Sequence, residues 1–274
     1  MKKIALSLIA TTAILSSSAN AGMVIDVQAG AGIWAPELSG FMSYGTDIVN
    51  KKYDFDGLNV ESTDTEFNNN YIYIDVDHLL PIVPNVRVER LNYSTSGDTV
   101  VTDTLTINAG DKFGDLVFQD GDSVKTELDM VQTDFILYWG IPGLNLLTAG
   151  IVDVDFGLMA KQLNGTYTMS TSSDDDEKAF DVWIPMAYAA VQVDVPFLPL
   201  ELEASTKIIS FQESEISDNM LKASLALPIP IPLIDTKLDV GYREQTLKID
   251  PELIGNFEAD IKAKGLFFGL SAKF

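Results

Sequence analysis

Acidic residues at alternate positions are the feature of this sequence most able to do chemistry. Asp75 and Asp77, like Asp153 and Asp155, are separated by a single residue. Successive side chains of a β-strand point to opposite faces, so both members of such a pair would share one face. On the strands expected below, this spacing predicts one polar face that carries Asp26, Asp75, Asp77, Gln132, Asp134, Asp153, Asp155, Glu201, Glu203, Asp235 and Asp239. The basic residues predicted on the same face are Arg87, Lys207, Lys237, Arg243 and Lys273.

The residue types give little support to general-base or metal chemistry. His78 is the only histidine, and it stands in an apolar, turn-forming stretch. Without it, general-base work falls to carboxylates that no motif marks. The acidic run at 174–177 could bind a divalent cation or help to bridge lipopolysaccharide phosphates. It lacks a glycine turn and a defined ligand spacing, so we favour a solvated charge run, and we predict no catalytic residue, no metal site and no cofactor.

Composition excludes several classes of protein. The chain has 40 acidic and 18 basic residues, which gives a formal net charge of −22. Nucleic-acid binding is excluded, because it needs Lys and Arg to displace the counterions of phosphate. The absence of cysteine removes disulfides, thiolate catalysis and thiolate metal sites together. It also leaves no residue on which a lipoprotein anchor could be built.

Residues 1–21 have the three parts of a secretory signal peptide. Met1-Lys2-Lys3 is basic, residues 4–15 are apolar, and Ala19-Asn20-Ala21 has the small-residue pattern of a cleavage site. The apolar run is too short to cross a bilayer as a helix. We predict cleavage after Ala21, which leaves residues 22–274. The formal net charge then changes from −22 to −24, since only two lysines are lost.

The end of the sequence predicts a membrane-spanning strand. One face of this strand is apolar: Leu266, Phe268, Leu270, Ala272 and Phe274. The other face suits a crowded and partly polar interior: Phe267, Gly269, Ser271 and Lys273. Residues 23–33 alternate in the same way, so the first and last strands can pair and close a barrel without leaving unpaired backbone groups in hydrocarbon. No run of 18 apolar residues follows residue 21, and no transmembrane helix is expected.

Turns and loops follow a regular order along the chain. Four apolar, proline-bearing links are expected to be short turns, because proline cannot donate to a strand ladder: 78–85, 140–145, 195–199 and 227–233. Long polar stretches are expected to be loops: 36–69, 95–126, 164–181, 211–220 and 246–258. About ten strands lie between them, with eight or twelve as alternatives, near 23–34, 70–79, 85–94, 127–139, 146–160, 182–195, 200–210, 221–228, 233–245 and 259–274. Short periplasmic turns and long extracellular loops are typical of outer-membrane barrels.

Aromatic residues gather near the ends of these predicted strands. In a membrane barrel they would form interface girdles. The residues concerned are Trp34, Tyr71, Tyr73, Tyr138, Trp139 and Trp183.

Three segments carry a family resemblance: residues 80–89, residues 182–196 and the ending Gly-Leu-Ser-Ala-Lys-Phe at 269–274. In these the sequence resembles an uncharacterised family of small proteobacterial outer-membrane β-barrel proteins. The resemblance implies an all-β, closed antiparallel transmembrane barrel in the bacterial outer membrane. It carries no catalytic residue to this chain.

The leading hypothesis is a non-enzymatic outer-membrane barrel that acts as a narrow pore or as a structural and surface-interaction protein. Small barrels are largely filled by their own side chains, so mixed charges favour a salt-bridged plug, with a narrow acidic pathway for cations as the alternative. A second hypothesis is a carrier of small apolar molecules, with residues 36–69 and 95–126 capping a lateral opening. A hydrolase at the outer rim is disfavoured, because His78 lies at the predicted periplasmic end.

The expected partners follow from the predicted location. They are outer-membrane lipid, lipopolysaccharide and the barrel-assembly machinery. The machinery would recognise the apolar alternation before the terminal aromatic residue, which consists of Phe268, Leu270, Ala272 and Phe274.

Overall fold

The computed structural model describes residues 25–44, 53–54, 69–78, 80, 82–100, 112–113, 116–117, 119, 121–229, 234–250 and 257–274. The predicted signal segment and most of the predicted loops at 36–69 and 95–126 lie outside these ranges. Within them, no helix is long and apolar enough to cross a membrane.

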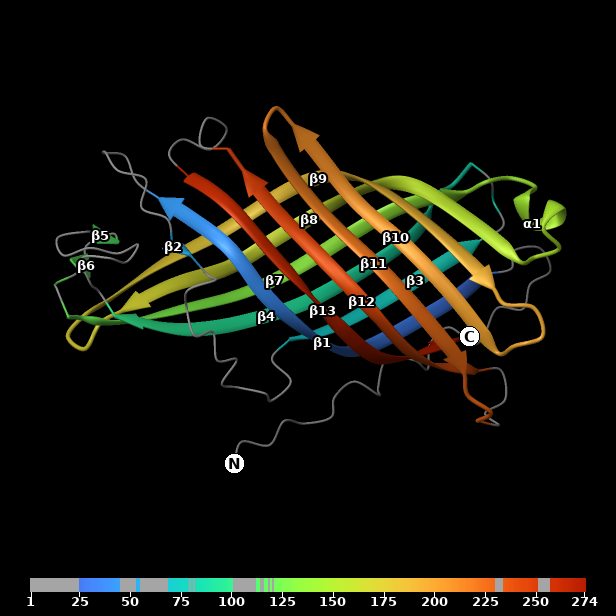
Figure 1. Ribbon diagram of the computed structural model, residues 1–274. Coiled ribbons are helices and arrows are strands. Elements are labelled where there is room, and N and C mark those ends of the chain that lie inside the picture. The colour runs from blue at the N-terminus through green and yellow to red at the C-terminus, as the bar shows by residue number, and fades with distance from the viewer. Residues whose placement is uncertain are drawn as a thin grey trace.

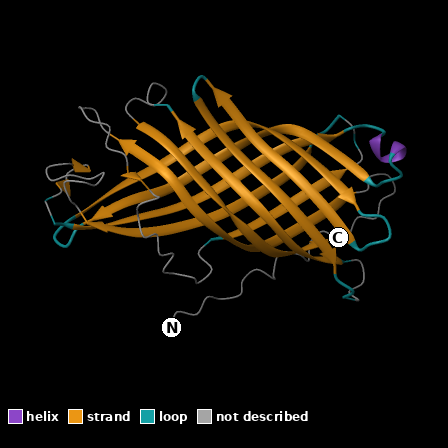
Figure 2. Cartoon of the chain, viewed as in Figure 1, coloured by secondary structure: helices purple, strands orange, loops and turns teal. Residues whose placement is uncertain are grey.

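Ten long strands form one closed antiparallel barrel (Figures 1 and 2). They are β1 (Ile25–Tyr44), β3 (Asn70–His78), β4 (Asn85–Val100), β7 (Ser123–Gly140), β8 (Val152–Ser170), β9 (Asp175–Asp194), β10 (Leu200–Phe211), β11 (Ser214–Ala226), β12 (Asp235–Ile249) and β13 (Phe257–Lys273). The short elements are β2 (Tyr53–Asp54), β5 (Lys112–Phe113), β6 (Leu116–Val117) and α1 (Leu144–Leu147). The predicted fold class is confirmed.

The barrel closes where the first and last strands meet. β1 pairs with β13 in one antiparallel register that runs from Gln28 opposite Lys273 to Tyr44 opposite Phe257. Each remaining long strand pairs with its neighbours in chain order. Closure gives every wall strand two partners, although among the described residues Asp175–Met186 of β9 pairs with β8 alone.

Two predicted loops are wrong, because strands occupy most of them. β8 continues to Ser170 and β9 begins at Asp175, and only residues 171–174 join them. β10 and β11 are joined by a turn at Gln212 and Glu213, where residues 211–220 were expected to be a loop. These segments are rich in Asp, Glu, Ser, Thr and Asn, which resembles loop composition although their backbones still pair. A third difference is that α1 precedes β8, so this strand begins at Val152 and not near residue 146.

An apolar belt surrounds the barrel on its outer face. The C-terminal strand shows the predicted alternation: Leu266, Phe268 and Leu270 expose about half of their surface, whereas Phe267 and Ser271 are buried inside. The belt has exposed side chains on every wall strand, among them Ile33, Ile74, Val86, Leu137, Leu158, Val191, Leu202, Leu221, Val240 and Leu266. From Leu266 to Phe274 it is about 20 Å tall, at about 3.3 Å per residue and a strand tilt of about 40°. An apolar belt of this kind is typical of a membrane-spanning barrel.

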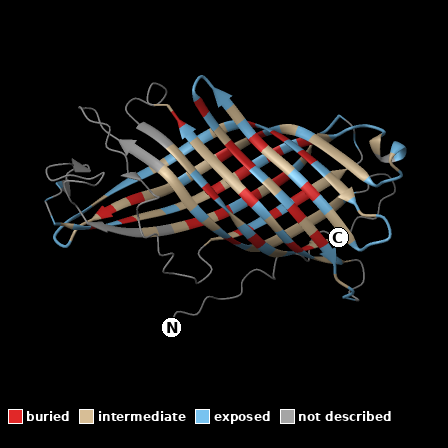
Figure 3. Ribbon diagram, viewed as in Figure 1, coloured by how far each residue is buried: buried red, intermediate tan, exposed pale blue. Residues whose placement is uncertain are grey.

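Most of the expected aromatic girdle points the other way. Trp34, Tyr71, Tyr73 and Tyr138 are buried inside the barrel, and the girdle prediction is wrong for these four. They occupy inward positions of their strands, as the alternation of buried and exposed stripes in Figure 3 shows. Trp183 lies on the outer face, where it stacks on Phe135 with 5.8 Å between ring centroids. Proximity to a strand end did not decide the direction of these side chains, because direction follows position parity.

Several strands extend past the belt at the end of the barrel opposite the four links, and the neighbouring strands β4, β7, β8 and β9 are among them (Figure 1). These parts of β4, β7, β8 and β9 comprise residues 92–100, 123–131, 162–170 and 175–181, and we call them the polar wall. Their outer positions are polar, for example Asn164 and Thr166 on β8. The end with the four links is called the link end below.

Candidate functional site

A buried network of three carboxylates and three cations spans the barrel interior, on the side of the polar wall. At its centre Asp218 accepts two hydrogen bonds from Arg243, at 2.8 Å from Nε and 2.6 Å from Nη2. Arg243 also reaches Oε1 of Glu89 at 2.7 Å. Asp134 accepts from Lys207 at 2.6 Å and from Lys161 at 3.2 Å. All are nearly inaccessible to solvent, and the charges balance within the group.

The contacts of this network cross the lumen. Glu89 on β4 and Arg243 on β12 lie four strands apart around the barrel, which is nearly opposite in a wall of ten. Nε2 of Gln245 on β12 donates to Oε1 of Gln132 on β7 at 3.2 Å, and these strands are fully opposite. This hydrogen bond crosses the middle of the lumen at that level.

A second layer lies closer to the link end. Arg87 is within 3.5 Å of both Asp75 and Glu203, and Glu203 also pairs with Lys222. The Arg87 guanidinium lies 4.5 Å from the centroid of the Tyr73 ring. The Arg87–Glu203 pair again joins β4 to β10 across the lumen. Cations here are therefore held by carboxylates and by an aromatic face together.

The third layer faces the link end. The Tyr138 hydroxyl lies 2.6 Å from Asp75 and 2.5 Å from Asp77, and its one proton serves either carboxylate. Lys237 pairs with Glu201 at 2.6 Å, and Lys273 pairs with Asp26 at 3.2 Å. The last pair is nearly half exposed, so charge pairing continues to the mouth of the barrel.

The prediction from the sequence included many of the charged residues found in the interior and omitted others. Asp75, Asp134, Glu203 and Asp239 are buried in the interior, while the remaining predicted inward acids lie nearer the link end and are partly or fully exposed: Asp26, Asp77, Asp153, Asp155, Glu201 and Asp235. The prediction omitted four buried charged residues of these layers: Glu89, Lys161, Asp218 and Lys222. Glu89 could have been found, since it stands two residues after Arg87 on the same face. Lys161 was missed because its strand was predicted to end at residue 160, and Asp218 because its strand was predicted to begin only at residue 221.

Asp239 differs from the other interior acids. It is 1% exposed, and within the described part of the chain neither of its carboxylate oxygens has a hydrogen-bond partner. In its layer, two cations, Arg87 and Lys222, interact with three carboxylates: Asp75, Glu203 and Asp239. A buried charge without a hydrogen bond lowers stability.

Replacing Asp239 with asparagine is therefore expected to raise the free energy of unfolding, by about 1–3 kcal/mol. The measurement is the temperature at which the folded band of an unboiled gel sample converts to the unfolded band. Asp235→Asn on the same strand is the control and should leave that temperature unchanged, because Asp235 is exposed. A lower temperature for Asp239→Asn would instead make this carboxylate a required counter-charge for Lys222.

Aromatic and aliphatic side chains fill the space between the charged layers. Trp34, Tyr71, Tyr73, Leu91 and Phe267 form one buried cluster. A second cluster contains Ile136, Tyr138, Met159, Met186 and Tyr188. The cavity beside the first cluster has a volume of about 20 Å³, close to the room one water molecule needs.

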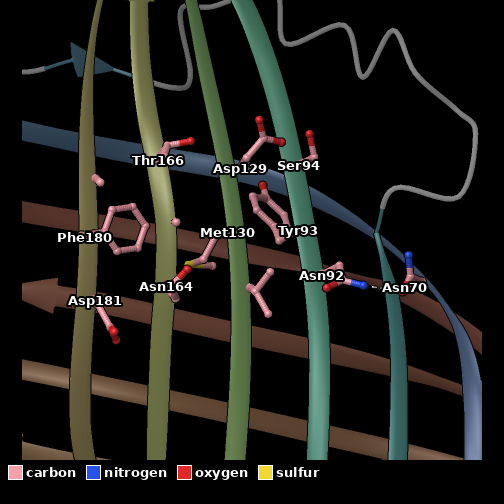
Figure 4. Close-up of a pocket in the computed structure, with 13 residues that line it drawn as sticks. Asn70, Asn92, Tyr93, Ser94, Asp129, Met130, Asn164, Thr166, Phe180 and Asp181 are labelled. Atoms are coloured by element: carbon pink, nitrogen blue, oxygen red, sulfur yellow. Dashed lines mark hydrogen bonds between the residues drawn. The ribbon is translucent and has the colours of Figure 1, made fainter.

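A shallow groove of about 880 Å³ crosses the outer face where the polar wall begins (Figure 4). It runs across β3, β4, β7, β8 and β9, and amides, hydroxyls and carboxylates line it: Asn70, Asn92, Ser94, Asp129, Asn164, Thr166 and Asp181. Asn92 donates to Asn70 at 2.8 Å, and Gln162 donates to Asp181 at 3.0 Å. Trp183 of the belt lies two residues from Asp181. This groove therefore sits directly above the apolar belt.

Two other sequence candidates are engaged in turns. Nε2 of His78 lies 3.1 Å from the Pro84 carbonyl oxygen, and its Nδ1 accepts from the Leu80 amide at 3.2 Å, so the ring holds the first link in shape. Of the acidic run, Asp174 ends the turn between β8 and β9, and Asp176 pairs with Lys178 at 3.2 Å.

Comparisons with known proteins were made by sequence and by structure. No protein-family model and no curated protein sequence matches the chain. Among solved structures, it is similar to the transport unit of the autotransporter AIDA-I from Escherichia coli, with a TM-score of 0.38, 6% identity, and coverage of 94% of this chain and 92% of that chain. The chain is also similar to the P. putida toluene transporter TodX, with a TM-score of 0.22, 7% identity, and coverage of 91% of this chain and 89% of that chain. For the CymD monoaromatic hydrocarbon channel the TM-score is 0.20 and the identity 9%, with coverage of 91% of this chain and 87% of that chain. With TM-scores below 0.5, we carry no residue or activity from them.

Proposed function

We propose that this chain is a non-enzymatic protein of the bacterial outer membrane, a closed barrel that does not conduct and that acts as a structural and surface-interaction protein. The observation that carries the proposal is the set of charge-paired contacts across the lumen. Arg87–Glu203 and Glu89–Arg243 join opposite walls at two levels. A path for ions would require both pairs to separate, which would leave buried charges without partners.

The outer surface supports the membrane location. An apolar belt of about 20 Å is close to the apolar band of outer-membrane barrels, and the polar wall begins where the belt ends. The signal-peptide pattern at residues 1–21 supports export. We place the link end in the periplasm and the polar wall outside the cell, because short links and long loops are distributed in that way in such barrels.

The polar wall supplies the working surface. Its groove lies at the height of the outer headgroups and offers amide and carboxylate groups such as Asn92, Asn164 and Asp181. These groups suit hydroxyl-rich ligands, since amides both donate and accept and carboxylates accept from pairs of hydroxyls. The interior offers less for an apolar cargo, as the cavity of about 20 Å³ beside the aromatic cluster is far below ligand size.

The test is electrical recording of the refolded chain in a planar bilayer. We expect no steady conductance from protein whose insertion is verified in the same preparation by heat-modifiable gel migration. Asp134→Asn is a matched variant that removes one network charge and should also remain silent, since the other cross-lumen pairs persist. Reproducible cation-selective steps from the unmodified protein would overturn the proposal and favour the acidic pathway.

A further inference from the structure

The four links at one end of the barrel are unusually apolar for segments that would face water. Residues 79–84, 141–151, 195–199 and 227–234 contain no charged residue and hold eight of the eleven prolines. By contrast, the turns at the opposite end are polar, for example Gln212-Glu213. The two ends of the barrel are therefore built for different surroundings.

Large apolar side chains of these links project fully outward. Leu146 and Ile82 expose 89% and 88% of their surface, Leu147 exposes 87%, and Phe197 is completely exposed. The exposed set, which we call the apolar crown, consists of Leu80, Ile82, Val83, Ile141, Leu146, Leu147, Phe197, Leu198 and Ile229. It includes at least one residue from each of the four links (Figures 1 and 3). Exposed apolar patches of this kind mark a surface that is covered by a partner or a membrane.

Part of the backbone of the links is hydrogen-bonded internally. In the second link, Leu147 N–H donates to Gly143 at 3.1 Å and Thr148 N–H donates to Leu144 at 2.9 Å, in and beside α1. In the third, Val195 and Leu200 are joined at 2.9 Å, and Leu198 donates to Val195 at 3.1 Å. Prolines remove further donors. Internal pairing of N–H groups is what hydrocarbon demands of a backbone.

The crown is continuous with the apolar belt. The outward residues next to the links are Val86 after the first link, Leu202 after the third and Leu225 before the fourth, and all three belong to the belt. The belt alone is about 20 Å tall, whereas the apolar band of outer-membrane barrels is about 25 Å. The links supply the missing height at this end.

We propose that the apolar crown is a lipid-binding surface that inserts into the periplasmic leaflet, at the boundary between acyl chains and headgroups. The barrel is then embedded up to its turns, and its periplasmic end contacts phospholipid in place of water. Because burial of Leu, Ile and Phe side chains is favourable, even partial insertion of the crown anchors the barrel at a fixed depth. This inference rests on the proposed membrane location.

Single-cysteine variants test the inference directly, since the native chain has no cysteine. Leu147→Cys and Phe197→Cys probe the crown, Leu270→Cys probes the belt, and Ser172→Cys probes the exposed turn at the opposite end. Each variant is labelled with a nitroxide and reconstituted in vesicles of phosphatidylethanolamine and phosphatidylglycerol. Collision with dissolved oxygen, which concentrates in hydrocarbon, is compared with collision with a water-soluble nickel chelate.

We expect the crown labels to resemble the belt label: collision with oxygen is retained, and collision with nickel is lost relative to Ser172→Cys. Crown labels that collide with nickel as often as Ser172→Cys, while Leu270→Cys stays in lipid, would overturn the inference and assign the crown to a protein partner. A belt label that itself meets nickel would instead refute the membrane location. The two failures are therefore distinguishable.

Discussion

Replacing Asp218 with alanine is expected to lower the free energy of unfolding by about 3–5 kcal/mol, because the change leaves buried cations without their shared carboxylate. Arg243 loses two hydrogen bonds, at 2.8 and 2.6 Å. Lys161 and Lys207 lose a carboxylate oxygen at 3.3 and 3.7 Å. None of the three cations is more than 5% exposed, so water cannot replace the lost partner. The midpoint of heat-modified gel migration should fall by roughly 10 °C.

Two further variants show whether the loss comes from unpaired charge. Asp175→Ala removes an exposed carboxylate from the outer face of β9 and should change stability by no more than about 0.5 kcal/mol. Asp218→Leu combined with Arg243→Met leaves Glu89 and Asp134 facing Lys161 and Lys207, so the charges still balance. This double variant should recover most of the lost stability. If Asp218→Ala unfolded at the same temperature as Asp175→Ala, the network would not stabilise the plug.

Valine at Gly30 is expected to displace the buried ring of Tyr73 and to cost about 3 kcal/mol. Gly30 on β1 lies directly opposite Tyr73 on β3, and the three atoms nearest to a Cβ at this position would all belong to the tyrosine side chain. Tyr73 is 4% exposed, accepts a hydrogen bond from Gln28 at 2.9 Å and lies against Arg87. An aromatic ring that covers a cross-strand glycine is a known way to stabilise a curved sheet.

A double-mutant cycle separates this close approach from a general effect on β1. Tyr73→Ala removes the ring, so the combined variant Gly30→Val/Tyr73→Ala should lose less stability than the sum of the single losses, by about 1–2 kcal/mol. Ala29→Val changes the adjacent, outward residue and should be nearly neutral, because valine suits a lipid-facing strand position. Strictly additive single losses would contradict the proposed contact between Gly30 and Tyr73.

The alternation of the sequence by itself predicted the closed antiparallel barrel and the lipid face of β13, and together with the links it predicted about ten strands, with eight or twelve left open. Alternation is a local property: a strand residue points to one side or the other according to its position, whatever its partner. The same rule predicted inward positions for Asp75, Asp134 and Asp239, and it would have found Glu89 and Lys222 had it been applied to every strand residue. It also decides against a girdle role for Trp34 and Tyr71.

Only the tertiary structure decided which charges meet. Arg243 and Glu89 are 154 positions apart in the numbering yet lie 2.7 Å apart, because strand order and stagger bring opposite walls to one level. No local pattern encodes that contact, and none encodes the lack of a hydrogen-bond partner for Asp239 among the described residues. Strand length beyond the belt was equally hidden, because the outer positions of β8 and β9 are polar there and the apolar outer face that marks a membrane-spanning strand is absent. Local chemistry thus specified the wall of this barrel, and long-range geometry specified how its interior is closed.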